Sequence, residues 1–211
     1  MLKITEIFFS LQGETTRVGL PTIFIRLTGC PLRCGYCDTA YAFSGGENTS
    51  INDIIQRIAK YNTKYVTVTG GEPLAQRNCL KLLTQLCDKG YDVSLETSGA
   101  IDVSEVDKRV VKIMDIKTPG SLESSKNNFD NLKHLTSADQ IKFVITDRAD
   151  YEWSKKIVSQ FDLDKKYEVL FSPSFGQVEY QVLANWILED QLHVRFQAQL
   201  HKIVWGDVKG K

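Results

Sequence analysis

Three cysteines crowd into one short segment of this sequence, as Cys30, Cys34 and Cys37. Thiolates favour zinc or an iron–sulfur cluster, and this spacing lets a single loop wrap one inorganic centre. A structural zinc site normally closes with four ligands, and no histidine or further cysteine lies near this loop in the sequence. Three thiolates on a four-iron cluster leave one iron open to a small molecule. A zinc half-site that a second copy of the chain completes is the alternative.

A second chemical feature is the segment GGEP at 70–73, which follows a β-branched run at 65–69. Paired glycines let a backbone approach a ligand because no Cβ intervenes. On its own, the segment is equally typical of a tight turn into a helix with Pro73 in its first turn. Cys79 and Cys87 lie in a stretch of helical apolar period, so we expect them to be buried small hydrophobes without chemistry.

Two alternating sequence patterns predict the strands and helices that position these residues. Short β-branched or aromatic runs predict strands over 22–27, 65–69, 92–96, 110–115, 140–145, 168–171 and 194–196. Stretches of helical period predict helices over 51–61, 76–89, 148–161 and 178–191. The region 117–131 is rich in Ser and Asn and predicts a loop. Such alternation is typical of a βα protein with a mainly parallel sheet.

The length of the chain restricts how such a sheet can close. A complete eight-unit barrel uses ~250 residues, so this chain predicts a shortened, open (partial) α/β barrel of about six βα units. In such sheets, ligands gather at the carboxyl ends of the strands. The cysteine loop, the glycines at 70 and 71, the segment 97–99 and Lys117 each follow a predicted strand. We therefore expect them to converge on one site, in a single domain that spans residues 1–211.

Composition excludes several other classes of protein. Hydrophobic residues make up 42% and charged residues 25% of the chain, which is typical of a folded soluble domain. The 26 Lys and Arg balance the 26 Asp and Glu, so no global positive field favours nucleic acid. No apolar run approaches the ~20 residues of a membrane span, and the N-terminal segment turns polar too early for a signal peptide. We expect a cytoplasmic protein with no membrane partner and no direct nucleic-acid partner.

Together, the cysteine loop and GGEP resemble the two signatures of the radical S-adenosylmethionine superfamily. Further segments extend the resemblance over most of the chain to the 7-carboxy-7-deazaguanine synthases: FFSLQGET at 8–15, FIRL at 24–27, DT at 38–39, TSG at 97–99, MDIKTP at 114–119, QIKF at 140–143 and QLHK at 199–202. The glycyl-radical activating enzymes share the cysteine spacing but not SLQGE or the Asp-Thr pair. A module that only holds a cluster or zinc without turnover needs neither SLQGE nor GGEP. These two classes are the alternatives.

The resemblance implies a lyase that converts 6-carboxy-5,6,7,8-tetrahydropterin to 7-carboxy-7-deazaguanine with loss of ammonia, in the pathway to queuosine, a tRNA modification, and related 7-deazapurines. It implies a 4Fe-4S cluster on Cys30, Cys34 and Cys37, S-adenosylmethionine on the open iron, and Mg²⁺ held by Thr39. Cleavage of S-adenosylmethionine gives a 5′-deoxyadenosyl radical that takes a hydrogen from C6 of the pterin. The implied partners are an electron donor such as flavodoxin and a second copy of the chain in a homodimer.

The resemblance also implies site residues. The substrate would be bound by Leu11, Gln12, Gly13, Glu14, Arg26 and Thr69. S-adenosylmethionine would be contacted by Tyr36, Cys37, Asp38, Gly71, Glu72, Asp115, Ile116, Lys117, Gln140, Ile141, Lys142 and Phe143. Residue chemistry adds that the planar guanidinium of Arg26 suits a substrate carboxylate, with a surface ion pair as the alternative. No protein acid or base is assigned, because His201 fits a proton donor and a structural histidine equally well.

Overall fold

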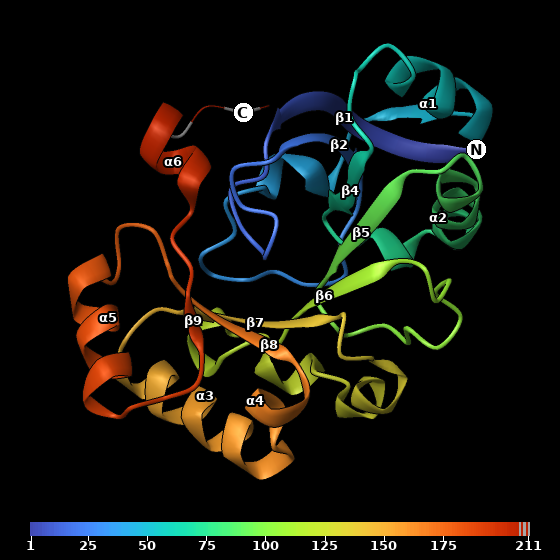
Figure 1. Cartoon of the computed structure of the whole chain (residues 1–211). Helices are drawn as coiled ribbons and strands as arrows, with labels where there is room; N and C mark the ends of the chain where they lie inside the picture. Colours follow the sequence, from blue (N-terminus) through green and yellow to red (C-terminus); the bar gives the residue numbers. More distant parts are fainter. Residues whose placement is uncertain (207, 209, 211) are drawn as a thin grey trace.

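One sheet of nine strands runs through the part of the chain that the computed structural model describes, which is residues 1–206, 208 and 210 (Figure 1). The strands are β1 (Leu2–Leu11), β2 (Pro21–Leu27), β3 (Glu47–Thr49), β4 (Tyr65–Gly70), β5 (Asp92–Thr97), β6 (Val111–Asp115), β7 (Gln140–Ile145), β8 (Glu168–Pro173) and β9 (Arg195–Phe196). The order is β3-β1-β2-β4-β5-β6-β7-β8-β9, with parallel pairing from β2 onward and antiparallel pairing of β1 with β2 and β3. The prediction of an open, mainly parallel α/β sheet is confirmed.

Helices connect the parallel strands. The α-helices of the described residues are α1 (Ile51–Ile58), α2 (Asn78–Asp88), α3 (Arg148–Phe161), α4 (Leu163–Lys166), α5 (Tyr180–Glu189) and α6 (Leu200–Trp205). Short 3₁₀ helices are η1 (Ala40–Phe43), η2 (Pro73–Ala75), η3 (Pro119–Ser121), η4 (Ser124–Lys126) and η5 (Phe129–His134). Within this same part of the chain, none of the helices combines the length and the apolar character that crossing a membrane requires.

Local signals explain where the predicted helices begin and end. The Ser50 hydroxyl accepts a hydrogen bond from the Asp53 N–H at 3.0 Å and starts α1. Gly90 follows α2 at a φ of 84°, the left-handed conformation that ends many helices. The helix over 148–161 has the predicted bounds, whereas α1, α2 and α5 are shorter than predicted. At the end of α1, for example, the Tyr61 N–H bonds to the Ile58 carbonyl at 3.1 Å as a turn.

Several elements were not predicted from the sequence. Strand β1 covers Leu2–Leu11. A register shift between Ile4 and Glu6 interrupts its apolar alternation. Strand β3, α4 and α6 are each six residues long or shorter. Short elements carry too little periodicity to be recognised, because their stability comes from tertiary contacts. The predicted loop at 117–131 forms η3, η4 and the first half of the 3₁₀ helix η5.

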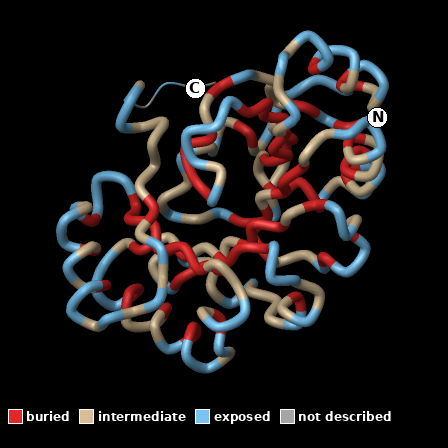
Figure 2. Tube along the Cα trace, viewed as in Figure 1, coloured by how far each residue is buried: buried red, intermediate tan, exposed pale blue. Residues whose placement is uncertain are grey.

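The two faces of the parallel strands differ: one packs in the apolar core and the other lines a cavity. On β2, Ile23, Ile25 and Leu27 have no exposed surface and pack in a core with α1 and α2, while Phe24 and Arg26 point the other way, into a cavity. Figure 2 shows the buried residues following the strands through the middle of the molecule. Because side chains alternate along a strand, the apolar core fixes which residues are left for the site.

We expect Ile25→Ala to lower the free energy of unfolding by about 2 to 5 kcal/mol, because the side chain is fully buried and a cavity would remain. Urea denaturation measured by circular dichroism tests this. Leu188→Ala is the matched control, since Leu188 is exposed on α5 and its change should stay within about 0.5 kcal/mol. Equal losses in the two variants would contradict this account of the core.

Candidate active site

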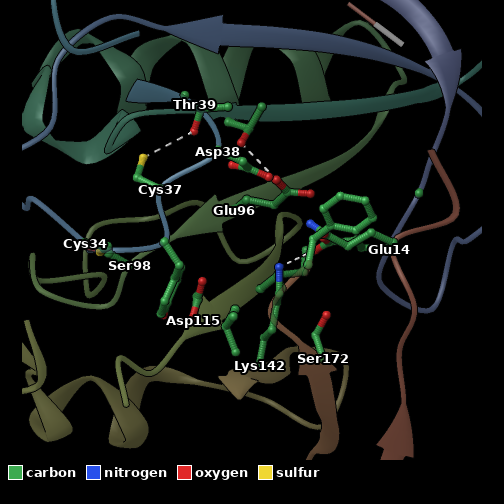
Figure 3. A pocket seen from close by; sticks show the side chains of 18 of the residues that line it. Glu14, Cys34, Cys37, Asp38, Thr39, Glu96, Ser98, Asp115, Lys142 and Ser172 are labelled. Carbon is green, nitrogen blue, oxygen red and sulfur yellow. Dashed lines mark hydrogen bonds and ion pairs between the residues drawn. The ribbon is translucent and has the colours of Figure 1, made fainter. Parts of the chain in front are cut away.

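A cavity of about 360 Å³ opens at the carboxyl ends of the parallel strands. The loops after β2, β4, β5 and β6 all contribute to its wall, through Cys30, Cys34, Cys37, Gly70, Gly71, Thr97, Ser98, Asp115 and Lys117. Figure 3 shows side chains from these loops facing one space, with Lys142 and Ser172 reaching it from the neighbouring strands. The convergence predicted from the sequence is confirmed.

The cysteine loop lies between β2 and η1, and its three thiols are free and half-buried at the cavity wall. Burial raises the pKa of Cys30 and of Cys34 above the ordinary value, so each thiol needs a metal or another cation to become a thiolate. Among the described residues, no group of three or more His, Cys, Asp or Glu lies close enough to hold a single metal ion. The three thiols line one cavity, and cysteine thiolates are the ligands that hold iron–sulfur clusters.

The glycines at 70 and 71 serve the packing of this loop. A Cβ on Gly71 would overlap the Gly29 carbonyl and lie 2.8 Å from the Cβ of Cys30. Gly70 has a φ of 153°, and a Cβ there would overlap the backbone of Leu27. The turn after β4 can approach the cysteine loop this closely only because both residues are glycines.

Glu72 lies beneath the cavity wall with no exposed surface. Its carboxylate accepts hydrogen bonds from the Leu74 N–H at 3.0 Å, the Thr97 hydroxyl at 2.9 Å, and the Ser98 N–H and hydroxyl at 2.7 and 2.6 Å. Its N–H donates to the Gly29 carbonyl at 2.8 Å. Glu72 therefore joins the ends of β2, β4 and β5, a position different from the direct cofactor contact expected from the sequence.

An ion pair between Glu14 and Lys142 crosses the opposite side of the cavity, from the end of β1 to β7 (Figure 3). Burial raises the pKa of Glu14, but Lys142, with Gln199 and His201, lowers it to about 2. Burial lowers the pKa of Lys142, yet the charges of Glu14 and Asp115 hold it above its ordinary value. The pair is therefore charged at neutral pH.

Glu96 is a site residue that the sequence reasoning missed. It is the penultimate residue of β5, directly before the TSG segment, and its carboxylate accepts hydrogen bonds from the Thr69 hydroxyl at 2.8 Å and from Gln12 Nε2 at 3.4 Å. Burial and the neighbouring charge of Glu14 raise the pKa of Glu96 above its ordinary value. Its place at the carboxyl end of a parallel strand was the signal that could have identified it.

Arg26 lines the cavity, and it also forms an ion pair with Glu6. Its Nε donates to Glu6 Oε1 at 2.7 Å, and the Tyr41 hydroxyl donates to the same oxygen at 2.8 Å. The guanidinium lies over the rings of Phe8 and Tyr41, about 6 Å from each centroid. These contacts hold the guanidinium in one orientation toward the cavity.

A second charged group borders the cysteine loop. Lys117 Nζ donates to Asp115 Oδ2 at 2.9 Å and lies 5.8 Å from the ring centroid of Tyr36. Burial lowers the pKa of Lys117, but Asp115 and Tyr36 raise it above its ordinary value. In the described part of the chain, Asp115 Oδ1 and the Tyr36 hydroxyl are buried without a hydrogen-bond partner. Such orphaned polar atoms at a cavity wall are suited to a polar ligand, such as an amino acid group.

Five residues of the expected S-adenosylmethionine set do not line the cavity. Glu72 was described above, and Ile116, Ile141 and Phe143 lie in the apolar core beneath the wall. Gln140 Nε2 donates instead to the Thr16 hydroxyl at 2.8 Å. On β7, alternation turns Ile141 and Phe143 to the core and Lys142 and Val144 to the cavity. Gln140 is on the same face as Lys142 but at the start of the strand, away from the carboxyl end where the cavity opens.

The C-terminal segment adds residues to the wall. Gln199 Nε2 donates to Glu14 Oε1 at 2.8 Å, and the Leu200 N–H donates to the Gly13 carbonyl at 2.9 Å. A Cβ on Gly13 would overlap the His201 ring, so this glycine permits the close packing of α6. Burial lowers the pKa of His201 below its ordinary value, which keeps the imidazole neutral at pH 7.

The fold and this cavity define a radical S-adenosylmethionine enzyme domain. The family model described as "Radical SAM superfamily" matches residues 24–143. A protein of Koribacter versatilis is 44% identical over 97% of both chains, and one of Chlorobaculum tepidum is 42% identical over 99% of this chain and 97% of its own. Both bear the name 7-carboxy-7-deazaguanine synthase. This chain belongs to the 7-carboxy-7-deazaguanine synthase family of the radical SAM superfamily.

Solved structures show the same fold. The crystal structure of QueE from Escherichia coli superposes with a TM-score of 0.77 over 95% of this chain and 94% of that one, at 24% identity. Streptococcus suis SuiB bound to S-adenosylmethionine gives a TM-score of 0.56 over 81% of this chain and 45% of that one. The fold is therefore shared with proteins whose sequence identity to this chain is low.

We expect Lys142→Met to destabilise the protein by about 3 to 5 kcal/mol at pH 7, because it leaves the Glu14 carboxylate buried without its partner. With the folded pKa of Glu14 at about 2 and its ordinary value at 4.5, pairing stabilises the folded state above pH 4.5, and that stabilisation is lost as the pH falls through about 2. The loss in the free energy of unfolding caused by Lys142→Met should therefore become smaller as the pH falls. Denaturant titrations between pH 7 and pH 3 measure it, and a deficit that is constant with pH would contradict the assignment.

Proposed function

We propose that this chain converts 6-carboxy-5,6,7,8-tetrahydropterin to 7-carboxy-7-deazaguanine with loss of ammonia, using a 4Fe-4S cluster, S-adenosylmethionine and Mg²⁺. The observation that carries the proposal is one cavity in which three free thiols face the charged side chains of Arg26 and Lys142. Relatives that are 42 to 44% identical over nearly the whole chain bear the name of this activity. We further propose that the chain is a single radical S-adenosylmethionine domain.

Cys30, Cys34 and Cys37 hold the cluster in this proposal. When bound and reduced, the cluster supplies the electron for cleavage of S-adenosylmethionine. The orphaned Asp115 Oδ1 and Tyr36 hydroxyl support binding of S-adenosylmethionine beside the loop. Lys117 adds a positive charge there, which suits a carboxylate.

The pterin occupies the side of the cavity bounded by β1, β2 and β5. Arg26 pairs with its carboxylate, while Glu14, Glu96 and Gln12 offer acceptors and a donor to the polar edge of its ring. The backbone of Leu11 and Gly13 and the Thr69 hydroxyl complete this wall. Thr39 lines the same cavity with its hydroxyl 3.9 Å from Cys37 Sγ, and a single hydroxyl suits Mg²⁺ that keeps most of its waters.

The proposed enzyme needs a source of single electrons, for which a flavodoxin-type protein is our candidate. Cytoplasmic localisation is part of the proposal, because free thiols and a reduced cluster persist in a reducing compartment. A homodimer is the proposed assembly, and the exposed Ile203 and Val204 on α6 give apolar surface that a second copy would cover.

We expect Cys34→Ala to lose its cluster. After anaerobic reconstitution, the unaltered protein should bind about four iron atoms per chain and show the broad visible absorption of a cysteine-ligated cluster. Cys87→Ala is the control, since this half-exposed cysteine lies far along the chain in α2 and its loss should leave the iron content unchanged. Full iron content in Cys34→Ala, or no product from reconstituted protein with pterin, S-adenosylmethionine and dithionite, would refute the proposed function.

We expect Arg26→Ala to raise the KM for the pterin about ten- to a hundredfold, the effect of removing a charged hydrogen-bond partner worth ~1.5 to 3 kcal/mol. Arg26→Lys should rescue only part of this loss, because a point charge cannot copy the planar fork. Iron content and pterin-independent formation of 5′-deoxyadenosine should persist in both variants. Unaltered pterin affinity in Arg26→Ala would exclude this contact.

A further inference from the structure

Strand β1 carries a β-bulge where it pairs with β2, between Ile4 and Glu6. Glu6 lies opposite Arg26, at the place where regular pairing from Ile4 would put the preceding residue. Because side chains alternate along a strand, a regular β1 with Ile4 in the core would turn Glu6 to the core as well. The bulge reverses the alternation and turns Glu6 to the face of the sheet that carries Arg26. Bulges that re-aim a side chain are frequent next to active sites, which makes Glu6 a candidate for a role there.

The Glu6 carboxylate determines which edge of the Arg26 guanidinium remains for a ligand. Arg26 Nε donates to Glu6 Oε1 at 2.7 Å, and the side chains of Arg26 and Glu6 are only 15% and 23% exposed. Within the described part of the chain, the two terminal nitrogens of Arg26 form no hydrogen bond. These two donors match the two oxygens of a carboxylate. With Nε occupied, Arg26 offers the cavity this one edge.

Tyr41 and Phe8 hold this ion pair in place. The Tyr41 hydroxyl donates to the same Glu6 oxygen at 2.8 Å, and Arg26 Cζ lies 5.9 and 6.0 Å from the ring centroids of Phe8 and Tyr41. Phe8 is in turn stacked on Phe24, with ring centroids 4.9 Å apart. Burial and Glu6 raise the pKa of Tyr41 to about 12 against the charge of Arg26, so its hydroxyl stays protonated at neutral pH and can donate. The guanidinium is therefore oriented before a ligand binds.

We propose that Glu6 is a positioning residue through which the site selects a pterin that carries a carboxylate over one that carries a neutral substituent. Glu6 acts through Arg26, and the inference rests on the proposed function for the contact of Arg26 with the substrate carboxylate. A side chain that is already ordered loses less rotamer entropy when it binds a ligand, so the oriented guanidinium binds a carboxylate more tightly. A neutral substituent forms no such pair and gains little from the orientation.

Orientation and charge make opposite predictions for Glu6. Its negative charge opposes the attraction of Arg26 for a second carboxylate, whereas its hydrogen bond orients the donors for that carboxylate. Glu6→Gln keeps the length of the side chain and the Oε1 acceptor, and among the described residues Glu6 Oε2 forms no hydrogen bond that an amide nitrogen would break. Glu6→Asp keeps the charge but is one methylene shorter, which draws the carboxylate away from Arg26 Nε.

The test measures binding without turnover. Reconstituted protein is titrated anaerobically with 6-carboxypterin, an oxidised and fluorescent analogue of the proposed substrate, and with 6-hydroxymethylpterin, which is neutral at that position. We expect Glu6→Asp to raise the Kd for 6-carboxypterin on the order of tenfold, because the hydrogen bond that orients the charged donors is lost, and Glu6→Gln to change it by less than about threefold. The Kd for 6-hydroxymethylpterin should stay the same in both variants. Glu47→Asp on β3 is the matched control, since the ion pair of Glu47 with Arg57 lies on the surface, and it should bind both pterins as the unaltered protein does.

A double variant tests whether Glu6 acts through Arg26. Glu6→Asp added to Arg26→Ala should weaken 6-carboxypterin no further than Arg26→Ala alone, because the group that Glu6 orients is absent. A further loss in the double variant would overturn the inference. Weaker binding of 6-hydroxymethylpterin in Glu6→Asp would also overturn it, because a general defect of the cavity weakens both pterins.

The same titrations distinguish failure of the inference from failure of the proposed function. Loss of 6-carboxypterin binding in Glu6→Gln, or unchanged binding in Glu6→Asp, would overturn the positioning role and leave the proposed function in place. Unaltered protein that binds neither pterin would count against the proposed function itself. Equal binding of both pterins by the unaltered protein would refute the contact of Arg26 with the substrate carboxylate, and the inference with it.

Discussion

The buried carboxylate of Glu72 is the interaction on which the site depends. It has no exposed surface, and hydrogen bonds from the backbone and side chains of two neighbouring loops satisfy it. Its own N–H holds the Gly29 carbonyl at the start of the cysteine loop. Because leaving a buried carboxylate unsatisfied costs much more than one hydrogen bond, the ends of β2, β4 and β5 are fixed together, and with them the cysteine thiols.

On the opposite side of the cavity, an ion pair between two side chains joins the elements of the sheet. An open sheet lacks the strands that would complete the ring, and here the Glu14–Lys142 ion pair connects the end of β1 with β7. The C-terminal segment then lies against this pair through Gln199, and α6 packs on Gly13. The cavity is thus enclosed on this side by side chains and a terminal helix.

The cysteine loop separates two chemical environments. Toward the cavity it presents thiols beside charged and hydrogen-bonding groups, and toward solvent it presents Pro31, Arg33 and Gly35 beside Leu122. Asp150 supports both, because the turn that it holds carries Lys117 on the cavity side and Leu122 on the outer side. The loop and the turn after β6 therefore present different residues to the cavity and to solvent.

The sequence by itself determined the chemistry of the site and the class of the fold. Cysteine spacing and GGEP are local, and the alternation of strands and helices places their loops at one edge of a parallel sheet. Tertiary structure decided which neighbours face the cavity. The segment QIKF does not reveal that Lys142 points to the cavity while Ile141 and Phe143 turn to the core, since that depends on which face of β7 meets the helices. The contact of Gln199 with Glu14 joins residues 185 positions apart, and local patterns carry no information about such a contact because it forms only when the chain has folded.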